Sequence, residues 1–223
     1  MTGFSAAGIE VRALLGVFAA AFLAREYVAY RRILPLKYVL TPLLTLIVIA
    51  VALLSLAVYP ATPYRLLIVA ALVFSLVGDV LLMIEEVNLL YQGMVFFFLA
   101  HCLYIPAFAS YYYPHWSGVF VAAALVVAAA FMMALTWKHS GAKAAPGFAY
   151  MGVLAAMVFF AASGFSAGAD ARSVMVLAGA ILFFASDCLL SVNHFIRKIN
   201  HSTVFTWLLY APAQMLFALS CHC

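Results

Sequence analysis

Charged residues are scarce in this chain of 223 residues, because Asp, Glu, Lys and Arg make up only 8% of it while 69% is hydrophobic. Soluble domains usually carry charge at about 25% of their positions. The scarcity excludes a soluble enzyme, a nucleic-acid-binding protein, a secreted disulfide scaffold and a disordered linker. The net charge of +4 chiefly reports where cytoplasmic loops lie and implies no nucleic-acid partner. The composition therefore predicts an integral membrane protein.

Cysteine and histidine are also too few and too scattered for a metal centre. The four cysteines show no spacing typical of a disulfide framework or a zinc site. Only His101 falls well inside an expected span, which leaves one histidine and two aspartates as possible ligands within the membrane. The chain offers no credible Ser-His-Asp arrangement, so serine hydrolase chemistry is not expected. We expect no metal and no cofactor.

Long apolar runs dominate what is present. A helix needs about 20 mostly apolar residues to cross the hydrocarbon core, and cutting the chain at its Pro, Gly and charge clusters leaves eight such runs. Arg25 and Glu26 interrupt the first run, whose helix can extend to Tyr30. The connections are short, so we predict an all-α polytopic membrane protein with a single integral membrane domain over residues 1–223. The predicted helices are 8–24, 37–59, 64–84, 92–112, 116–137, 146–166, 173–192 and 201–220.

Basic residues in the connections predict the orientation, because Lys and Arg are enriched in cytoplasmic loops. Most of them fall in the first, fifth and seventh connections. With eight helices, this distribution puts both termini on the non-cytoplasmic side. The membrane itself stays open between a bacterial inner membrane and the eukaryotic endoplasmic reticulum. The cytoplasmic set is Arg25, Arg31, Arg32, Lys37, Lys138, Lys143, Arg197 and Lys198, against Arg12, Arg65 and Arg172 on the other side.

A short pattern occurs twice, four helices apart. Segments 78–82 and 186–190 both read small-Asp-x-Leu-Leu, and segments 103–107 and 209–213 both read Leu-Tyr-x-Pro-Ala. Copies separated by four helices have the same orientation in the membrane. The pattern therefore indicates a possible parallel 4+4 repeat about an axis along the membrane normal, with chance similarity of apolar sequence as the alternative.

Each copy of the pattern carries an aspartate inside a predicted span. Burying such a residue costs about 2.5 to 3.5 kcal/mol, so it marks a functional site by default; an aspartate hydrogen-bonded only for packing is the alternative. Asp79 and Asp187 each lie five residues before the predicted cytoplasmic end of their helix, or about 7.5 Å at the helical rise. At equal depth they can face one cavity, where paired carboxyls can divide the roles of proton donor and base.

Several further residues are candidates for supporting or substrate-binding roles. Ser75 shares the helix face of Asp79. The helices that follow the two aspartates each carry a pair of polar residues one turn apart, His101 with Tyr104 and Tyr210 with Gln214. Lys37 could pair with a lipid phosphate, although snorkelling to the interface is equally open. The full supporting set is Lys37, Ser75, His101, Tyr104, Ser186, Tyr210 and Gln214.

Taken together, these residues resemble the YhhN family, eight-helix membrane proteins that include lysoplasmalogenases. The resemblance runs from about Lys37 onward and rests on Gly78-Asp79, Gly93, Phe97, Ala100-His101, Tyr104, Ser186 to Leu190, Tyr210 and Gln214. It implies hydrolysis of the vinyl ether bond of lysoplasmalogen to a fatty aldehyde and glycerophosphoethanolamine or glycerophosphocholine, with Asp79 and Asp187 as the catalytic residues. The implied partners are a lysophospholipid substrate and membrane lipids, and the oligomeric state stays open.

The chemistry of the bond agrees with two carboxyls. Protonating the alkenyl carbon of a vinyl ether makes an oxocarbenium ion that water captures, and glycosidases handle a similar ion with paired carboxyls. We expect one aspartate to be the general acid and the other to stabilise the cation and activate water. Membrane carboxylates and repeats are also typical of proton-coupled transporters or channels, and a lipid-binding protein without catalysis is a third possibility.

Overall fold

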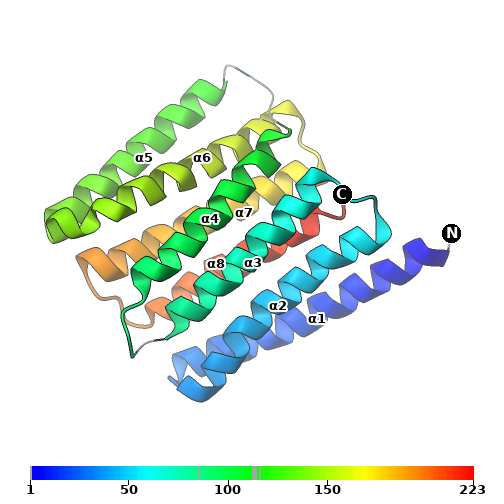
Figure 1. Ribbon diagram of the computed structural model, residues 1–223, viewed down its shortest axis with the longest axis horizontal. Helices are drawn as coiled ribbons and strands as arrows, with labels where there is room; N and C mark the ends of the chain where they lie inside the picture. Colours follow the sequence, from blue (N-terminus) through cyan, green and yellow to red (C-terminus); the bar gives the residue numbers. More distant parts are fainter. Residues whose placement is uncertain (1, 85, 112–114, 116) are drawn as a thin grey trace.

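The computed structural model describes residues 2–84, 86–111, 115 and 117–223, and this part of the chain consists of helices joined by short turns and connections. The prediction of an all-α fold is confirmed. The first helix runs well beyond the expected 8–24 and ends at Tyr30. The described part forms α1 (Thr2–Tyr30), α2 (Leu34–Val58), α3 (Pro63–Met83), α4 (Leu90–Ala109), α5 (Ser117–Ser140), α6 (Ala145–Ala167), α7 (Ala171–Ser191) and α8 (Ser202–Ser220), with a 3₁₀ turn η1 (Gly141–Ala144) and a π turn η2 (Val192–Ile196) (Figure 1).

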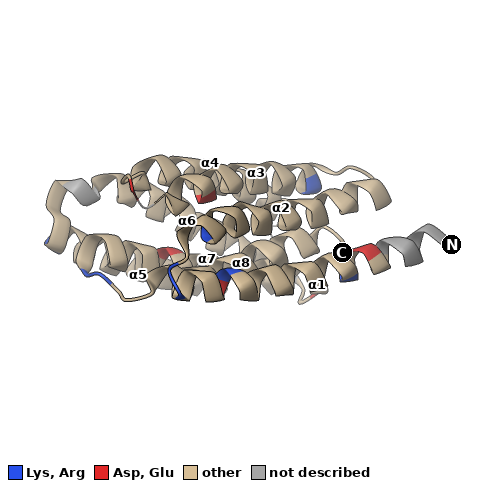
Figure 2. Ribbon diagram, turned by 90° about the horizontal axis from the view of Figure 1, so that it is seen from below, with Lys and Arg blue, Asp and Glu red and all other residues tan. Residues whose placement is uncertain are grey.

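Seven helices of the described chain, α2 to α8, are long and apolar enough to cross a membrane. The protein is thus an integral, multi-pass membrane protein. We expected eight spans, and α1 is not among the seven. It carries four charged residues, Glu10, Arg12, Arg25 and Glu26, whereas Figure 2 shows how few charges interrupt the other helices.

Local sequence explains where the functional helices begin. Thr62 caps the N-terminus of α3 by accepting a hydrogen bond from the amide of Arg65, and Pro63 occupies the first helical position. Asp170 caps α7 in the same way, because its carboxylate accepts from the amide of Ser173 at 2.7 Å. That hydrogen bond stabilises the charged form and lowers the pKa of Asp170 from its ordinary value.

The helices pack in two layers. Helices α2, α3 and α4 lie along one side of the molecule, and α6, α7 and α8 complete the core, with α4 against α6 and α2 against α8 (Figure 1). Helix α1 lies outside against α2 and α8, and α5 lies outside against α6. The main contacts of the first half have counterparts in the second, α1 with α2 matching α5 with α6, and α2 with α8 matching α6 with α4, whereas the packing of α1 on α8 has no counterpart of similar extent among the described helices. This is the packing that a parallel 4+4 repeat predicts.

Close packing within each half depends on a glycine. A Cβ atom added to Gly78 of α3 would lie 2.7 Å from Phe97 of α4, and one added to Gly179 of α7 would lie 2.7 Å from Phe217 of α8. The missing side chains let an aromatic ring of the following helix approach the backbone. In α3 this close approach occurs immediately beside Asp79.

Candidate functional site

Asp79 of α3 and Asp187 of α7 line the same cavity, which we call the acid cavity. It lies where the C-terminal turns of α3 and α7 meet the N-terminal turns of α2 and α8, and it holds about 430 Å³ of space free of protein atoms, its mouth included. Both aspartates are buried, with 3% and 6% of their surfaces exposed. The polar side chains that line it are Arg25, Lys37, Asp79, Ser186, Asp187, Thr203, Thr206 and Tyr210.

The carboxylate of Asp79 is held by hydroxyl groups. Thr45 of α2 donates to its Oδ2 at 2.5 Å, and the hydroxyl of Tyr210 also interacts with it. Behind Tyr210, the amide nitrogen of Gln214 donates to the Tyr210 oxygen at 2.9 Å, and Tyr104 donates to the Gln214 carbonyl at 2.7 Å. A chain of buried polar groups thus runs from Asp79 into the centre of the bundle, and it joins α3, α8 and α4.

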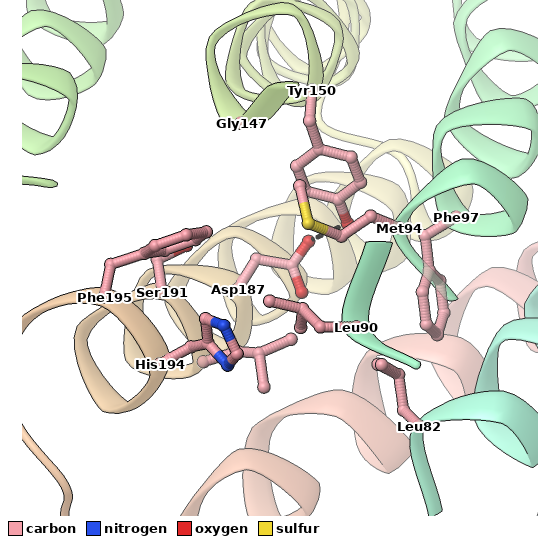
Figure 3. A pocket seen from close by; sticks show the side chains of 11 residues that line it. Leu82, Leu90, Met94, Phe97, Gly147, Tyr150, Asp187, Ser191, His194 and Phe195 are labelled. Carbon is pink, nitrogen blue, oxygen red and sulfur yellow. Dashed lines mark hydrogen bonds between the residues drawn. The ribbon is translucent and has the colours of Figure 1, made fainter. Parts of the chain in front are cut away.

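Asp187 has an equivalent arrangement in the other half of the molecule. The hydroxyl of Tyr150 from α6 donates to its Oδ2, and Figure 3 shows the two side chains pointing toward one another. Each aspartate therefore accepts a hydrogen bond from the helix that precedes its own, α2 before α3 and α6 before α7. Our sequence analysis missed Thr45 and Tyr150, although each is a hydroxyl-bearing residue inside an otherwise apolar run.

A second space adjoins Asp187 on the side of α4, α6 and η2, and we call it the apolar hollow. It has about 380 Å³ of space free of protein atoms, open solvent at its mouth included, and it shares Leu82, Phe97, Asp187 and Leu190 with the acid cavity. Its other lining is mostly apolar, as Figure 3 shows: Leu90, Met94, Gly147, Tyr150, Ser191, His194 and Phe195. Asp187 thus lies where the two spaces meet.

Of the expected supporting residues, Lys37, Ser186 and Tyr210 line the acid cavity itself. Tyr104 and Gln214 lie behind Tyr210 in the polar chain described above. Two others line neither space. His101 is fully buried in α4, with Nδ1 2.5 Å from the carbonyl oxygen of Phe97 and its ring packed edge-on against Tyr150 and Phe183.

Ser75 is also fully buried, one turn before Asp79 and beside Tyr104. It therefore packs behind the acid cavity and does not form part of its wall. Ser75 was predicted on the helix face of Asp79. In the structure it lies near the site, but its side chain does not reach the cavity.

Two basic residues are placed differently from our expectation. Arg25 was expected in the first connection and Lys37 at the exposed cytoplasmic end of the second helix, but Arg25 lies inside α1 with 0% of its surface exposed, and Lys37 lies in the first turn of α2 with only 3% exposed. Both line the acid cavity. Helix α1 continues to Tyr30 and packs against α2 and α8, the two neighbouring helices that also line the cavity.

The chain contains one sequence match to a serine hydrolase motif, but it lies away from the two aspartates. Residues 164–168 read G-x-S-x-G, the sequence of a nucleophile elbow, which requires a sharp turn from a strand into a helix. Ser166 instead lies in the last turn of α6, where its hydroxyl donates to the backbone oxygen of Ala162 at 3.0 Å. This end of α6 is opposite the end that faces Asp187, so the motif has no part in the site.

Comparison with known proteins agrees with the resemblance noted above. The sequence model described as the YhhN family matches residues 36–221, which contain both aspartates and leave out all of α1. Human "Lysoplasmalogenase TMEM86A" is 32% identical over 168 residues, which cover 72% of this chain and 67% of the human protein. No solved structure matches the chain. Because the family match extends over most of the chain and includes every helix that lines the acid cavity except α1, this protein belongs to the YhhN family.

Proposed function

We propose that this protein is a lysoplasmalogenase that cleaves the vinyl ether bond of lysoplasmalogen. The observation that carries the proposal is a pair of buried aspartates on one cavity, with an apolar hollow beginning at Asp187. A lysoplasmalogen has a polar glycerophosphate end, a reactive vinyl ether and an apolar chain in that order, which matches the order of the spaces around the acids. The relationship to a human protein named as a lysoplasmalogenase supports the same reaction.

The proposed chemistry needs one proton donor and one carboxylate. The donor protonates the β-carbon of the alkenyl chain, and the resulting oxocarbenium ion is stabilised by the carboxylate of the other aspartate. Water adds to the α-carbon and gives a proton to that carboxylate. The product of this addition is a hemiacetal. The hemiacetal then breaks down: the second aspartate gives its proton to the glycerol oxygen as the C–O bond breaks, and the hemiacetal hydroxyl gives its proton to the first aspartate. The products are a fatty aldehyde and the free glycerol hydroxyl, one water is consumed, and both aspartates return to their starting protonation states.

The surroundings of the aspartates suit this task. Thr45 and Tyr150 hold the two carboxyl groups in place from opposite helices, which is the kind of positioning that acid-base catalysis depends on. In the proposed complex the alkenyl chain occupies the apolar hollow, while Lys37, Ser186 and Tyr210 contact the glycerophosphate end. Tyr104 and Gln214 orient Tyr210 from behind.

The test is aldehyde release by the purified protein in detergent, from lysoplasmalogen and from its saturated-ether analogue. The wild-type protein should cleave only the vinyl ether, because the saturated ether cannot form the oxocarbenium ion by simple protonation. Asp79→Asn and Asp187→Asn should each lower the rate by about 10²- to 10⁴-fold, the usual contribution of a general acid or base. Asp170→Asn, at an exposed aspartate that lines neither the acid cavity nor the apolar hollow, is the matched control and should retain the rate.

Near-normal aldehyde release by either cavity variant would overturn the assignment. A proton-coupled transporter is the alternative, and pH-dependent solute uptake into liposomes without aldehyde release would support it.

A further inference from the structure

The apolar hollow adjoins a third space on the side away from the acid cavity, and we call this space the methionine chamber. It is lined by α5, α6, the end of α7 and η2, and it has about 250 Å³ free of protein atoms, its mouth included. Gly147, Ser191 and Phe195 line both the hollow and the chamber, and we call these three residues the junction. The three spaces therefore adjoin in series, from the acid cavity through the hollow to the chamber.

The two neighbours of the apolar hollow lie on opposite sides of Asp187. Phe97 is shared with the acid cavity, and Phe195 is shared with the methionine chamber. Figure 3 shows Phe97 on one side of the Asp187 carboxylate, and Phe195 on the other. A linear ligand that reacts at Asp187 can therefore have one end in the acid cavity and the other directed toward the chamber.

One face of α7 forms a continuous wall along this path. Ser191 and Phe195 follow Asp187 by four and eight residues, the spacing that places side chains on one face of a helix. Phe195 belongs to η2, which extends this wall beyond the end of α7. The hydroxyl of Ser140 from α5 donates to the backbone oxygen of Phe195 at 2.9 Å. The wall therefore leads from the acid to the space beside α5.

The lining of the chamber suits a flexible hydrocarbon chain. Met132 and Met133 of α5 and Met151 of α6 line it, and methionine is a flexible apolar side chain that adapts to irregular partners. Thr136 lines it as well, but its hydroxyl donates to the backbone oxygens of Met132 and Met133 at 2.9 and 3.0 Å. None of the described residues that line the chamber is charged. The lining therefore favours an alkyl chain over a polar head group.

Gly147 keeps the junction open. It lies in the first turn of α6, and a Cβ atom added there would meet no atom within 4 Å. A larger side chain at this position would therefore have room to enter the junction without displacing the protein. The missing side chain matters for what passes the junction and not for how α6 packs.

The junction is close to the reacting group. Ser191 lies one helical turn beyond Asp187, or about 6 Å along α7. An extended chain advances about 1.2 Å per bond, so a chain with its vinyl ether at Asp187 reaches the junction after about five bonds. Most of a long fatty chain must then lie beyond the junction.

We propose that the alkenyl chain passes the junction and ends in the methionine chamber, so that Gly147 determines which chain lengths the protein accepts. The inference rests on the proposed function for the chain that enters. It adds the subsite that holds the far end of that chain and the residue that determines chain specificity.

The experiment measures equilibrium binding of two saturated-ether lysophospholipids, which cannot be cleaved, to the protein in phosphatidylcholine nanodiscs. One ligand has a chain of about four carbons, which ends before the junction, and the other has about sixteen and must cross it. Affinities are expressed per ligand in the bilayer, so that partitioning of the longer chain into lipid does not count as binding.

Gly147→Leu and Gly147→Phe should each weaken binding of the long-chain ligand by about 10- to 100-fold, because the added side chain and the alkyl chain compete for one space. Binding of the short-chain ligand should not change. Gly147→Ala adds only a methyl group and should have a smaller effect on the long-chain ligand than either larger residue.

Gly152→Leu is the matched control. Gly152 lies in the same helix, is exposed, meets no atom within 4 Å of an added Cβ, and lines none of the three spaces. This variant should bind both ligands as the wild type does. Equal loss of both ligands in Gly147→Leu, no loss of either, or the same loss in Gly152→Leu would overturn the proposed path of the chain.

This experiment separates the two proposals. If the Gly147 variants lose only the long-chain ligand but the wild type releases no aldehyde from lysoplasmalogen, the reaction is wrong and the chain subsite stands. If the wild type releases aldehyde and the Gly147 variants cleave long and short alkenyl lipids as the wild type does, the reaction stands and the chain subsite is wrong.

Discussion

Replacing Tyr150 by phenylalanine removes a single hydroxyl group from the site and keeps the ring that fills the space. The lost hydroxyl donates to Asp187, and the ring remains packed edge-on against His101 at 5.4 Å. A hydrogen bond to a charged group contributes about 1.5 to 3 kcal/mol. If that contribution orients Asp187 in the transition state, kcat/KM for aldehyde release should fall by about 10- to 100-fold.

Thr45→Val is the equivalent change at the other aspartate, since it also removes only a hydroxyl. Asp79 keeps its interaction with Tyr210 in that variant, so the loss of activity should be smaller than in Tyr150→Phe. The comparison tests whether Asp187, with Tyr150 as its hydroxyl donor, loses more activity on removal of that donor than Asp79, which has both Thr45 and Tyr210.

The assay measures kcat and KM for aldehyde release together with the melting temperature of each variant. Tyr38→Phe is the matched control, because the Tyr38 hydroxyl donates to the carboxylate of Glu86 at 2.6 Å in an exposed position and Tyr38 lines neither the acid cavity nor the apolar hollow. Unchanged activity in Tyr150→Phe, or a larger loss in Thr45→Val, would refute the reasoning. An equal fall in the control would point to a general effect of losing a hydroxyl.

Two further predictions concern stability. Gly78→Ala would place a methyl group 2.7 Å from Phe97, so the variant should lose about 1 to 3 kcal/mol and melt at a lower temperature, whereas Gly152→Ala, which meets no atom within 4 Å, should not. Asp170→Ala removes the cap that accepts from Ser173 and should cost about 1 kcal/mol at neutral pH. Because the folded-state pKa of Asp170 is lowered, that stabilisation is present above the ordinary aspartate pKa and is lost as the pH falls through the folded-state value. The melting temperatures of the wild type and Asp170→Ala should therefore converge in acid. A difference that stays constant with pH would contradict the role of Asp170 as a charged cap.

Helix positions could be read from the sequence because the bilayer sets the length of an apolar run. The same rule singled out Asp79 and Asp187, since a carboxyl at membrane depth is costly enough to require an explanation. Their equal depth followed from counting residues to the helix ends. These inferences use only the order of residues along one helix, so they do not require knowledge of how the helices pack.

The partners of the aspartates could not be read in this way. A single Thr45 or Tyr150 in an apolar run is a weak signal, because most such hydroxyls bond to their own helix backbone. Arg25 gave a misleading signal, since a basic residue near the expected end of a span ordinarily marks a loop. Here α1 continues to Tyr30 and carries this residue into the interior.

The sequence alone determined the class of protein, the helices and the two acids at matching depth, because hydropathy and the helical rise act on neighbouring residues. Only the tertiary structure decided that the acids share a cavity, that Thr45 and Tyr150 hold them, and that Arg25 and Lys37 face the same space. Such contacts are between residues far apart in the chain, as for Tyr104 and Gln214, which are separated by 110 positions. They depend on how each helix is rotated against its neighbours, and that rotation is set by packing between helices.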